Sequence, residues 1–149
     1  MFGKLKRIYL IISLLSTFLY AESLTIKVKL SNAQINKTKE NYLIISFIPE
    51  DNVFLNFYPL LKIEIEENRY LKFPKDKLKA NDLDVEVFGM GNNKFINIKT
   101  PIKIPFELGK KYKRGKYILV FTIEGFYTRL NDKITIKFFS KQEVPYYIK

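Results

Sequence analysis

The chain has 149 residues with a formal net charge of +11 at pH 7; 47% of the residues are hydrophobic, and none is cysteine or histidine. This length and composition suit one domain with a packed core and exclude a largely disordered chain. The missing residue types exclude thiol redox chemistry, a Ser-His pair and the usual zinc ligands. We therefore expect a protein with no metal, no cofactor and no catalytic residues.

The first segment of the chain has the order of a secretory signal peptide. Basic residues near the start precede an apolar run, Ile8 to Leu19, and Ala21 is a small residue at a cleavage point. The run is shorter than the roughly 20 apolar residues that a membrane span needs. Leu19 departs from the small-x-small cleavage pattern, so an uncleaved anchor is the alternative. We predict a signal peptide over residues 1–21, a domain over residues 22–149, and a periplasmic or secreted location.

Strand patterns begin directly after that segment. Leu24 to Leu30 alternates apolar and polar residues, which predicts a half-buried strand. Tyr42 to Ile48 is apolar almost throughout and predicts a central strand covered on both faces. Further strands are predicted over Val53–Tyr58 and Leu61–Glu66, whereas the polar stretch Lys75–Leu83 predicts a loop with at most one helical turn.

The second half of the chain predicts two hairpins. Residues Asp84–Lys99 have strand character on both sides of Gly89–Asn93, and glycine and asparagine tolerate the positive φ of a tight turn. Pro101–Phe106 alternates, but its prolines cannot donate to a ladder, which predicts an edge strand or strand ends. Lys116–Phe126 is the longest predicted strand, and we expect Lys133–Phe139 to pair with it across a turn.

These patterns together predict an all-β fold. About eight or nine short strands at close spacing, with little helical periodicity, favour a two-sheet antiparallel sandwich. A barrel is the alternative, but it would have more even strand lengths and no proline-rich edge.

Carboxylates are the weaker candidates for chemistry. Glu64 and Glu66 lie two residues apart on one predicted strand, as a weak cation site or an acid–base pair would require. The solvent face of an amphipathic strand explains them better, because the apolar residues of that strand take the other face. Asp82, Asp84 and Glu86 lack the glycine of a calcium-binding loop. A hydrolase that uses Glu64 and Glu66 is therefore a minor alternative.

Surface residues of two kinds favour a binding function. Apolar side chains at turn tips mark contact surfaces, and we expect Phe88 and Met90 at one tip and Phe126 and Tyr127 at another. The segment Gly109–Lys116 is the main basic cluster, and its members are Lys110, Lys111, Lys113, Arg114 and Lys116. A solvated loop explains this cluster, and export argues against nucleic acid. Weak contact with a membrane surface, or binding of anionic lipid or polysaccharide, is the alternative.

Several segments, in order, resemble a known family: the exported N-terminal domain of the thiol–disulfide interchange protein DsbD. Asp84–Phe106 resembles the cap loop of that family, with its aromatic-glycine pair, and the strand that follows. Gly115–Phe126 resembles the strand that ends in the Tyr-Gln-Gly-Cys of the family, and Asn41–Ile65 resembles its earlier strands. The likeness covers most of residues 22–149 and implies an immunoglobulin-like sandwich.

Both redox cysteines of that family are absent from this chain. Gly125 is followed by Phe126 where the family has a cysteine, and the place of the second cysteine falls near Asp132. The resemblance implies a redox-inactive relative in which Phe126 fills the space beneath Phe88. The cap loop with Phe88 and Gly89 would then share one surface with the hairpin that follows Gly125.

The function that the resemblance implies is a non-catalytic protein-binding module of the cell envelope. Its partner would be an envelope protein, such as a thioredoxin-like or membrane redox component. The alternative is a structural or adhesive sandwich that self-associates through an edge strand such as Pro101–Phe106.

Overall fold

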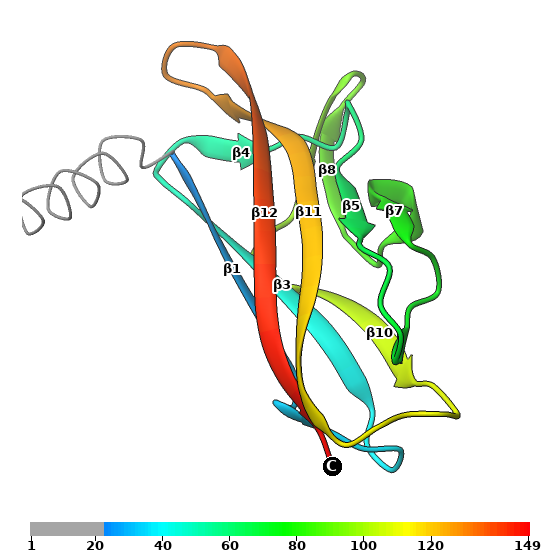
Figure 1. The fold of residues 1–149 in the computed structure, drawn as a ribbon. Helices are drawn as coiled ribbons and strands as arrows, with labels where there is room; N and C mark the ends of the chain where they lie inside the picture. The colour runs from blue at the N-terminus through cyan, green and yellow to red at the C-terminus, as the bar shows by residue number, and fades with distance from the viewer. Residues whose placement is uncertain (1–22) are drawn as a thin grey trace, which may run out of the picture.

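The computed structural model describes residues 23–149, which form an all-β sandwich (Figure 1). This confirms the predicted fold class. The expected signal peptide over residues 1–21 lies outside the described residues. Within residues 23–149, the structure contains no helix of the length and hydropathy that a membrane crossing requires.

One layer is a four-stranded antiparallel sheet. Its strands, in spatial order, are β1 (Leu24–Leu30), β3 (Asn41–Pro49), β10 (Ile102–Leu108) and β6 (Leu71–Lys72). Alternation decides which side faces the core: Leu43 and Ile45 on β3 and Ile104 on β10 are at most 2% exposed. This sheet is the blue, cyan and yellow-green layer of Figure 1.

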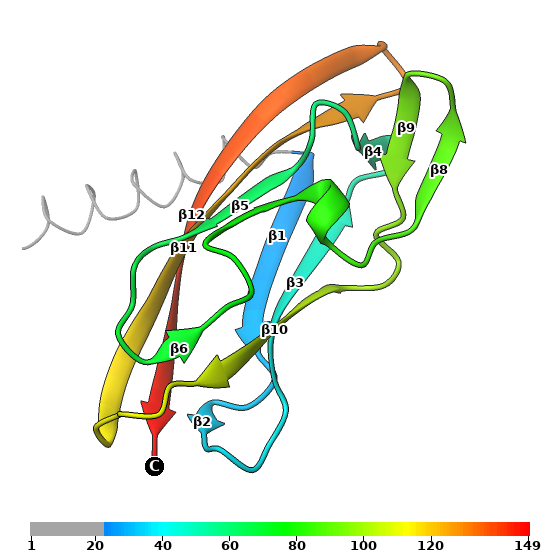
Figure 2. The ribbon, with the colours of Figure 1, turned by 90° about the vertical axis from the view of Figure 1, so that its right-hand side faces the viewer.

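The second layer is built on one long hairpin. Its path of strands is β2 (Gln34–Ile35), β12 (Ile134–Ile148), β11 (Gly115–Arg129), β5 (Lys62–Ile65) and β7 (Lys77–Lys79), and β4 (Val53–Leu55) also pairs with β11. The β2–β12 pairing is parallel and the others are antiparallel. The predicted pairing across the last hairpin is confirmed, and β11 and β12 together run the length of the molecule (Figures 1 and 2).

A small separate hairpin completes the described chain. It consists of β8 (Val87–Met90) and β9 (Asn93–Ile96), joined through Gly91 and Asn92. A 3₁₀ turn, η1 (Ala80–Asp82), precedes it. The loop predicted over Lys75–Leu83 therefore contains a short strand, β7, as well as the single helical turn.

The core lies between the two large sheets. Phe47 on β3 and Phe138 on β12 meet across it, with their ring centroids 6.4 Å apart. β11 contributes Leu119, Phe121 and Ile123, all 0% exposed. Burial of these side chains supplies the main driving force for folding, because each removes a large apolar area from water.

Two details differ from the sequence prediction. β3 is central in its sheet, as predicted, but only one of its faces is covered, and Ile48 is 46% exposed. The described residues form twelve strands rather than eight or nine, and the sequence patterns missed β2 and β7, which are only two and three residues long. Such short strands carry too few residues to show an alternation.

The edge character of Pro101–Phe106 is confirmed. From Ile102 to Phe106, β10 pairs with β3 on one side, and β6 covers its other side only at Glu107 and Leu108. Lys103 and Pro105 are exposed on this stretch. A lysine and a residue without an N–H group both discourage pairing with another chain.

A stack of three tyrosines closes the end of the sandwich where the chain terminates. The ring centroids of Tyr70 and Tyr117 are 4.9 Å apart, and those of Tyr117 and Tyr146 are 5.6 Å apart. Tyr146 is 2% exposed. Burial, followed by the charges of the neighbouring Tyr117 and Tyr70 phenolates, raises the pKa of Tyr146 to about 12.

Alkaline titration should test this stack. Below pH 10 the Tyr146 phenol is neutral in the folded and unfolded chains, so its protonation does not change stability. Between pH 10 and about 12 only the unfolded chain loses the proton, so the free energy of unfolding should fall. Urea denaturation at pH 8, 10 and 11 should show this fall, and Tyr146→Phe should reduce its slope. An equal slope in both proteins would contradict the assignment.

Candidate functional site

The β8–β9 hairpin projects at the end of the sandwich where β11 turns into β12 (Figure 2). Gly91 in its turn has a φ of 60°, and Gly89 inside β8 has a φ of 106°. A Cβ atom on Gly89 would overlap the main-chain carbonyl oxygen of Asn93. The predicted hairpin is therefore confirmed with a tighter turn than expected, because Met90 and Asn93 already pair.

Three aromatic rings hold the hairpin to the second sheet. The centroid of Phe54, on β4, lies 5.9 Å from that of Phe88 and 5.4 Å from that of Phe95. Phe88 and Phe95 face each other across the hairpin at 5.7 Å. This cluster fixes the Phe88 side chain and leaves it 44% exposed.

Asn56 connects the hairpin to the long strand β11. Its N–H donates to the Phe126 carbonyl at 2.9 Å, and its Oδ1 accepts from the Thr128 hydroxyl at 2.8 Å. Asn56 also bridges to Phe95, and the next N–H, that of Phe57, donates to the Lys94 carbonyl at 2.9 Å. The two turns that the sequence predicted to share a surface therefore lie at the same end of the molecule.

Exposed apolar side chains gather at this end. Met90 is 86% exposed, which is the largest value among the exposed large apolar residues of the described chain. The set, called here the apolar end, consists of Tyr58, Val87, Phe88, Met90, Leu130 and Ile134, each at least 40% exposed. Single exposed apolar residues are ordinary, but six of them at one end of the molecule indicate a candidate contact surface.

Two depressions flank the hairpin. The apolar one has a volume of about 280 Å³, and Pro49, Phe54, Phe88 and Ile98 are among its lining residues. The polar one has a volume of about 490 Å³ and is lined by Asn56, Asn92, Asn93, Lys94, Phe95, Thr128, Leu130, Lys133 and Thr135. Both depressions carry lysine and no carboxylate among these lining residues, with Lys99 in the first.

The prediction for Tyr127 is wrong. Tyr127 was expected on an exposed turn tip, but it is 3% exposed and its ring packs beside Phe138 in the core, with the centroids 6.2 Å apart. The reason is that β11 continues to Arg129, because β4 and β12 both pair with its last residues. The turn itself comprises Leu130 to Lys133.

Phe126 does not fill the space beneath Phe88. It lies on the partly exposed side of β11, opposite to its neighbours Gly125 and Tyr127. Phe54 occupies the position against Phe88 instead. Val53, Phe54 and Leu55 are all apolar, so no alternation in the sequence identifies Phe54 as the residue on the outer face; the structure shows Val53 and Leu55 buried and Phe54 partly exposed.

Asp132 lies in the turn after β11 and pairs with Arg129 at 2.9 Å. Both side chains are partly exposed, so this ion pair shapes the turn and contributes little to stability. The candidates Phe88, Gly89 and Met90 all lie on β8, so Gly89 and Met90 belong to the strand and not to the turn predicted over Gly89–Asn93.

The carboxylate candidates do not form a reactive pair. Glu64 and Glu66 each face a lysine, Lys77 at 3.8 Å and Lys141 at 3.7 Å, on an exposed surface. Asp82 accepts from Lys75 and from the Lys79 main-chain N–H, and these hydrogen bonds lower the pKa of its carboxyl group. Within residues 23–149, His, Cys, Asp and Glu residues form no group of three or more that could hold a metal ion.

The basic cluster lies at the opposite end of the sandwich, in the loop between β10 and β11 and on the first residues of β11. Its members Lys110, Lys111, Lys113, Arg114 and Lys116 are all exposed. The β8–β9 hairpin and the β10–β11 loop lie at the two ends of the sandwich (Figure 1), with exposed apolar side chains at the first end and exposed cations at the second.

Comparisons with known proteins found no matching family model, no matching curated protein and no matching solved structure. The class that the fold defines is a β-sandwich with an exposed hairpin.

Proposed function

We propose that this protein is an exported, non-catalytic protein-binding module of the cell envelope, and that it binds its partner through the apolar end. The observation that carries the proposal is the set of exposed apolar side chains at the apolar end, among which Phe88 is held in place by Phe54 and Phe95. Anchored aromatic residues surrounded by polar groups are typical of the energetic centre of a protein interface. The resemblance noted above suggests a thioredoxin-like or membrane redox component as the partner.

The outer edge of β8 suggests how the partner binds. Asn97 donates to the Glu86 carbonyl, so the antiparallel pattern makes Glu86 and Phe88 hydrogen-bonded positions within the hairpin. The main-chain groups of Val87 and Gly89 then point to the other edge of β8. An extended segment of a partner can add there as a further strand and place its side chains against Phe88 and Met90.

The charges around the hairpin indicate which segment would fit. Lys94 and Lys133 line the polar depression, and Lys99 lines the apolar one. Asp84 and Glu86, which precede β8 and line a third depression, are the acidic exceptions. A partner segment with apolar side chains, and with acidic residues next to Lys94, Lys99 and Lys133, would complement this surface. The proposed partner is therefore a protein with an extended, apolar segment of acidic character.

Site-specific photo-cross-linking tests the proposal. A photoreactive residue at Met90 should give a discrete adduct with an envelope protein. The same residue at Phe139, which is 64% exposed on the long hairpin, should not. The captured protein is then identified, and its cross-linked peptide is expected to be an extended acidic–apolar segment.

Matched variants make the result quantitative. Met90→Asp should weaken binding of the captured partner about tenfold or more, because a charge would be buried at the centre of the interface. Phe139→Asp introduces the same charge away from the hairpin and should bind normally. Equal binding by the two variants, or equal cross-linking from both positions, would refute the proposed surface.

A further inference from the structure

Two loops that are distant in sequence meet at the end opposite the apolar end. One follows β2 and comprises residues 36–40, and the other, residues 109–114, connects β10 to β11. With Lys116 they form the basic end, whose charged residues are Lys37, Lys39, Glu40, Lys110, Lys111, Lys113, Arg114 and Lys116. These are seven cations and one carboxylate, a net charge of +6. Residues 22–149 contain 23 basic and 15 acidic residues and carry a net charge of +8, so the basic end holds most of the excess positive charge.

The cations of the basic end have no carboxylate partners within the described chain. Among residues 23–149 there are five ion pairs, and they involve Lys75, Lys77, Arg129, Lys137 and Lys141. Each of these lies outside the basic end. Seven like charges left together repel one another, and an external anion would relieve that repulsion.

Aromatic rings hold part of this charge in place. The ammonium nitrogen of Lys37 lies 5.3 Å from the centroid of the Tyr112 ring, which joins the two loops. The nitrogen of Lys116 lies 5.6 Å from the centroid of Tyr147. Tyr117 donates its hydroxyl hydrogen to the Lys113 carbonyl at 2.9 Å, which restrains the second loop.

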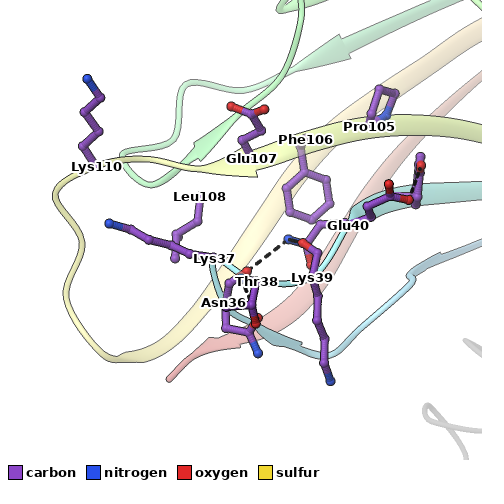
Figure 3. Close-up of a pocket in the computed structure, with 12 residues that line it drawn as sticks. Asn36, Lys37, Thr38, Lys39, Glu40, Pro105, Phe106, Glu107, Leu108 and Lys110 are labelled. Atoms are coloured by element: carbon purple, nitrogen blue, oxygen red, sulfur yellow. Dashed lines mark hydrogen bonds between the residues drawn. The ribbon is translucent and has the colours of Figure 1, made fainter.

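A depression of about 600 Å³ lies between the β2–β3 loop and β10 (Figure 3). The exposed Pro105 and the partly exposed Leu108 contribute apolar surface to it, whereas Phe106 lines it but is only 4% exposed. Asn36 and Thr38 contribute an amide and a hydroxyl group. Figure 3 shows Lys37, Lys39 and Lys110 extending outward in different directions. The cations therefore surround the depression instead of converging on a single point within it, which suits a long polyanion better than one small anion.

We infer that the basic end binds an anionic polysaccharide, a sugar polymer carrying carboxylate or phosphate groups. The surrounding lysines would pair with the charged groups, and the apolar floor would contact a sugar ring. The carboxylates of Glu40 and Glu107, which also line the depression, would accept hydrogen bonds from sugar hydroxyls. This site is independent of the proposed protein-docking surface.

Two other polyanions fit the structure less well. A phosphate backbone has fewer free hydroxyl groups than a polysaccharide. The Glu40 and Glu107 carboxylates would therefore repel it without accepting hydrogen bonds in return. A lipid surface would require apolar side chains to insert beside the cations; only Ile118 and Tyr147 are exposed large apolar residues near Lys116, whereas six such residues lie at the other end of the molecule. The chemistry of the depression therefore favours a glycan.

Binding of the full chain to polygalacturonate, with uncharged dextran as the blank, tests the inference. We expect polygalacturonate to bind at about 0.05 M salt, with affinity falling steeply towards about 0.5 M salt, because screening weakens exposed charge contacts. Lys110→Glu/Lys111→Glu/Lys113→Glu should bind about tenfold more weakly. The control Lys27→Glu/Lys29→Glu/Lys103→Glu has the same net charge, and its changes lie on exposed positions of β1 and β10. It should lose much less affinity for polygalacturonate.

A second variant distinguishes a real site from general attraction without depending on the folding of the triple variants. Glu107→Ala removes the carboxylate that would accept from sugar hydroxyls and should bind polygalacturonate about twofold to threefold more weakly at low salt, although the loss of a negative charge alone would strengthen the attraction of any polyanion. Equal losses in the two triple variants, or tighter binding by Glu107→Ala, would overturn the inference. Tighter binding to a DNA oligonucleotide, or to phosphatidylglycerol vesicles, would also overturn it and would identify the polyanion class instead.

Discussion

Replacing Phe138 with alanine is expected to lower the free energy of unfolding by about 3–5 kcal/mol. The Phe138 side chain is 2% exposed and lies between the sheets, in contact with Phe47 of the facing sheet and with Tyr127 of its own. Its removal leaves a void at the centre of the sandwich that the neighbouring side chains can fill only in part.

The same ring explains a glycine inside the longest strand. Gly125 pairs directly with Phe138, and a Cβ atom on Gly125 would lie 2.9 Å from both Phe138 Cζ and Leu61 Cδ1. Gly125→Ala should therefore destabilise the native chain by about 1–3 kcal/mol, because the core is overpacked. In the Phe138→Ala background the added methyl group enters the void. We expect the double variant to be at least about 1 kcal/mol more stable than the two single effects predict.

Urea denaturation of the four proteins in this cycle measures the coupling between the two residues. Phe139→Ala is the matched control, because Phe139 is the next residue and is 64% exposed, and it should change stability by less than about 0.5 kcal/mol. Strictly additive effects of the Gly125 and Phe138 substitutions would show that these residues do not share the packing described.

This glycine also explains where the sequence prediction of the fold was limited. The alternation in Leu24–Leu30 identified a real strand, because one face of it must meet the core, and the apolar segment Lys116–Phe126 identified most of another. The strand was predicted to end at Phe126, one residue after Gly125. In the structure the strand continues to Arg129, because the absent side chain makes room for Phe138. The need for that room cannot be deduced from residues adjacent in sequence.

The candidate site, like the fold, could be predicted from the sequence only in part. Glycine and asparagine around Met90 identified the β8–β9 hairpin, because the backbone requirements of a tight turn are local. The end of the strand was predicted too early, so the core residue Tyr127 was predicted to lie on the surface. The contact of Lys37 with Tyr112 joins loops more than 70 residues apart, and no local pattern encodes such a meeting.

Replacing Gly89 with alanine is expected to disrupt the β8–β9 hairpin and to abolish capture of the partner, while the two large sheets persist. The φ of 106° at Gly89 disfavours any L-residue, at a cost of about 1–2 kcal/mol, and the new Cβ atom would overlap the Asn93 carbonyl oxygen. Relief requires the hairpin to separate at this point. Because β8 pairs only with β9 among residues 23–149, the disruption should stay local.

Hydrogen exchange resolves the local effect from the global one. Amides of β8 and β9 should lose protection in Gly89→Ala, whereas those in the centres of β11 and β12 should keep theirs. Gly91→Asn is the matched control, because its φ of 60° suits asparagine and its Cβ would meet no atom within 4 Å. Partner capture by Gly89→Ala after loss of hairpin protection would show that the partner binds elsewhere on the sandwich. Retained protection would show that the hairpin accommodates a side chain at residue 89.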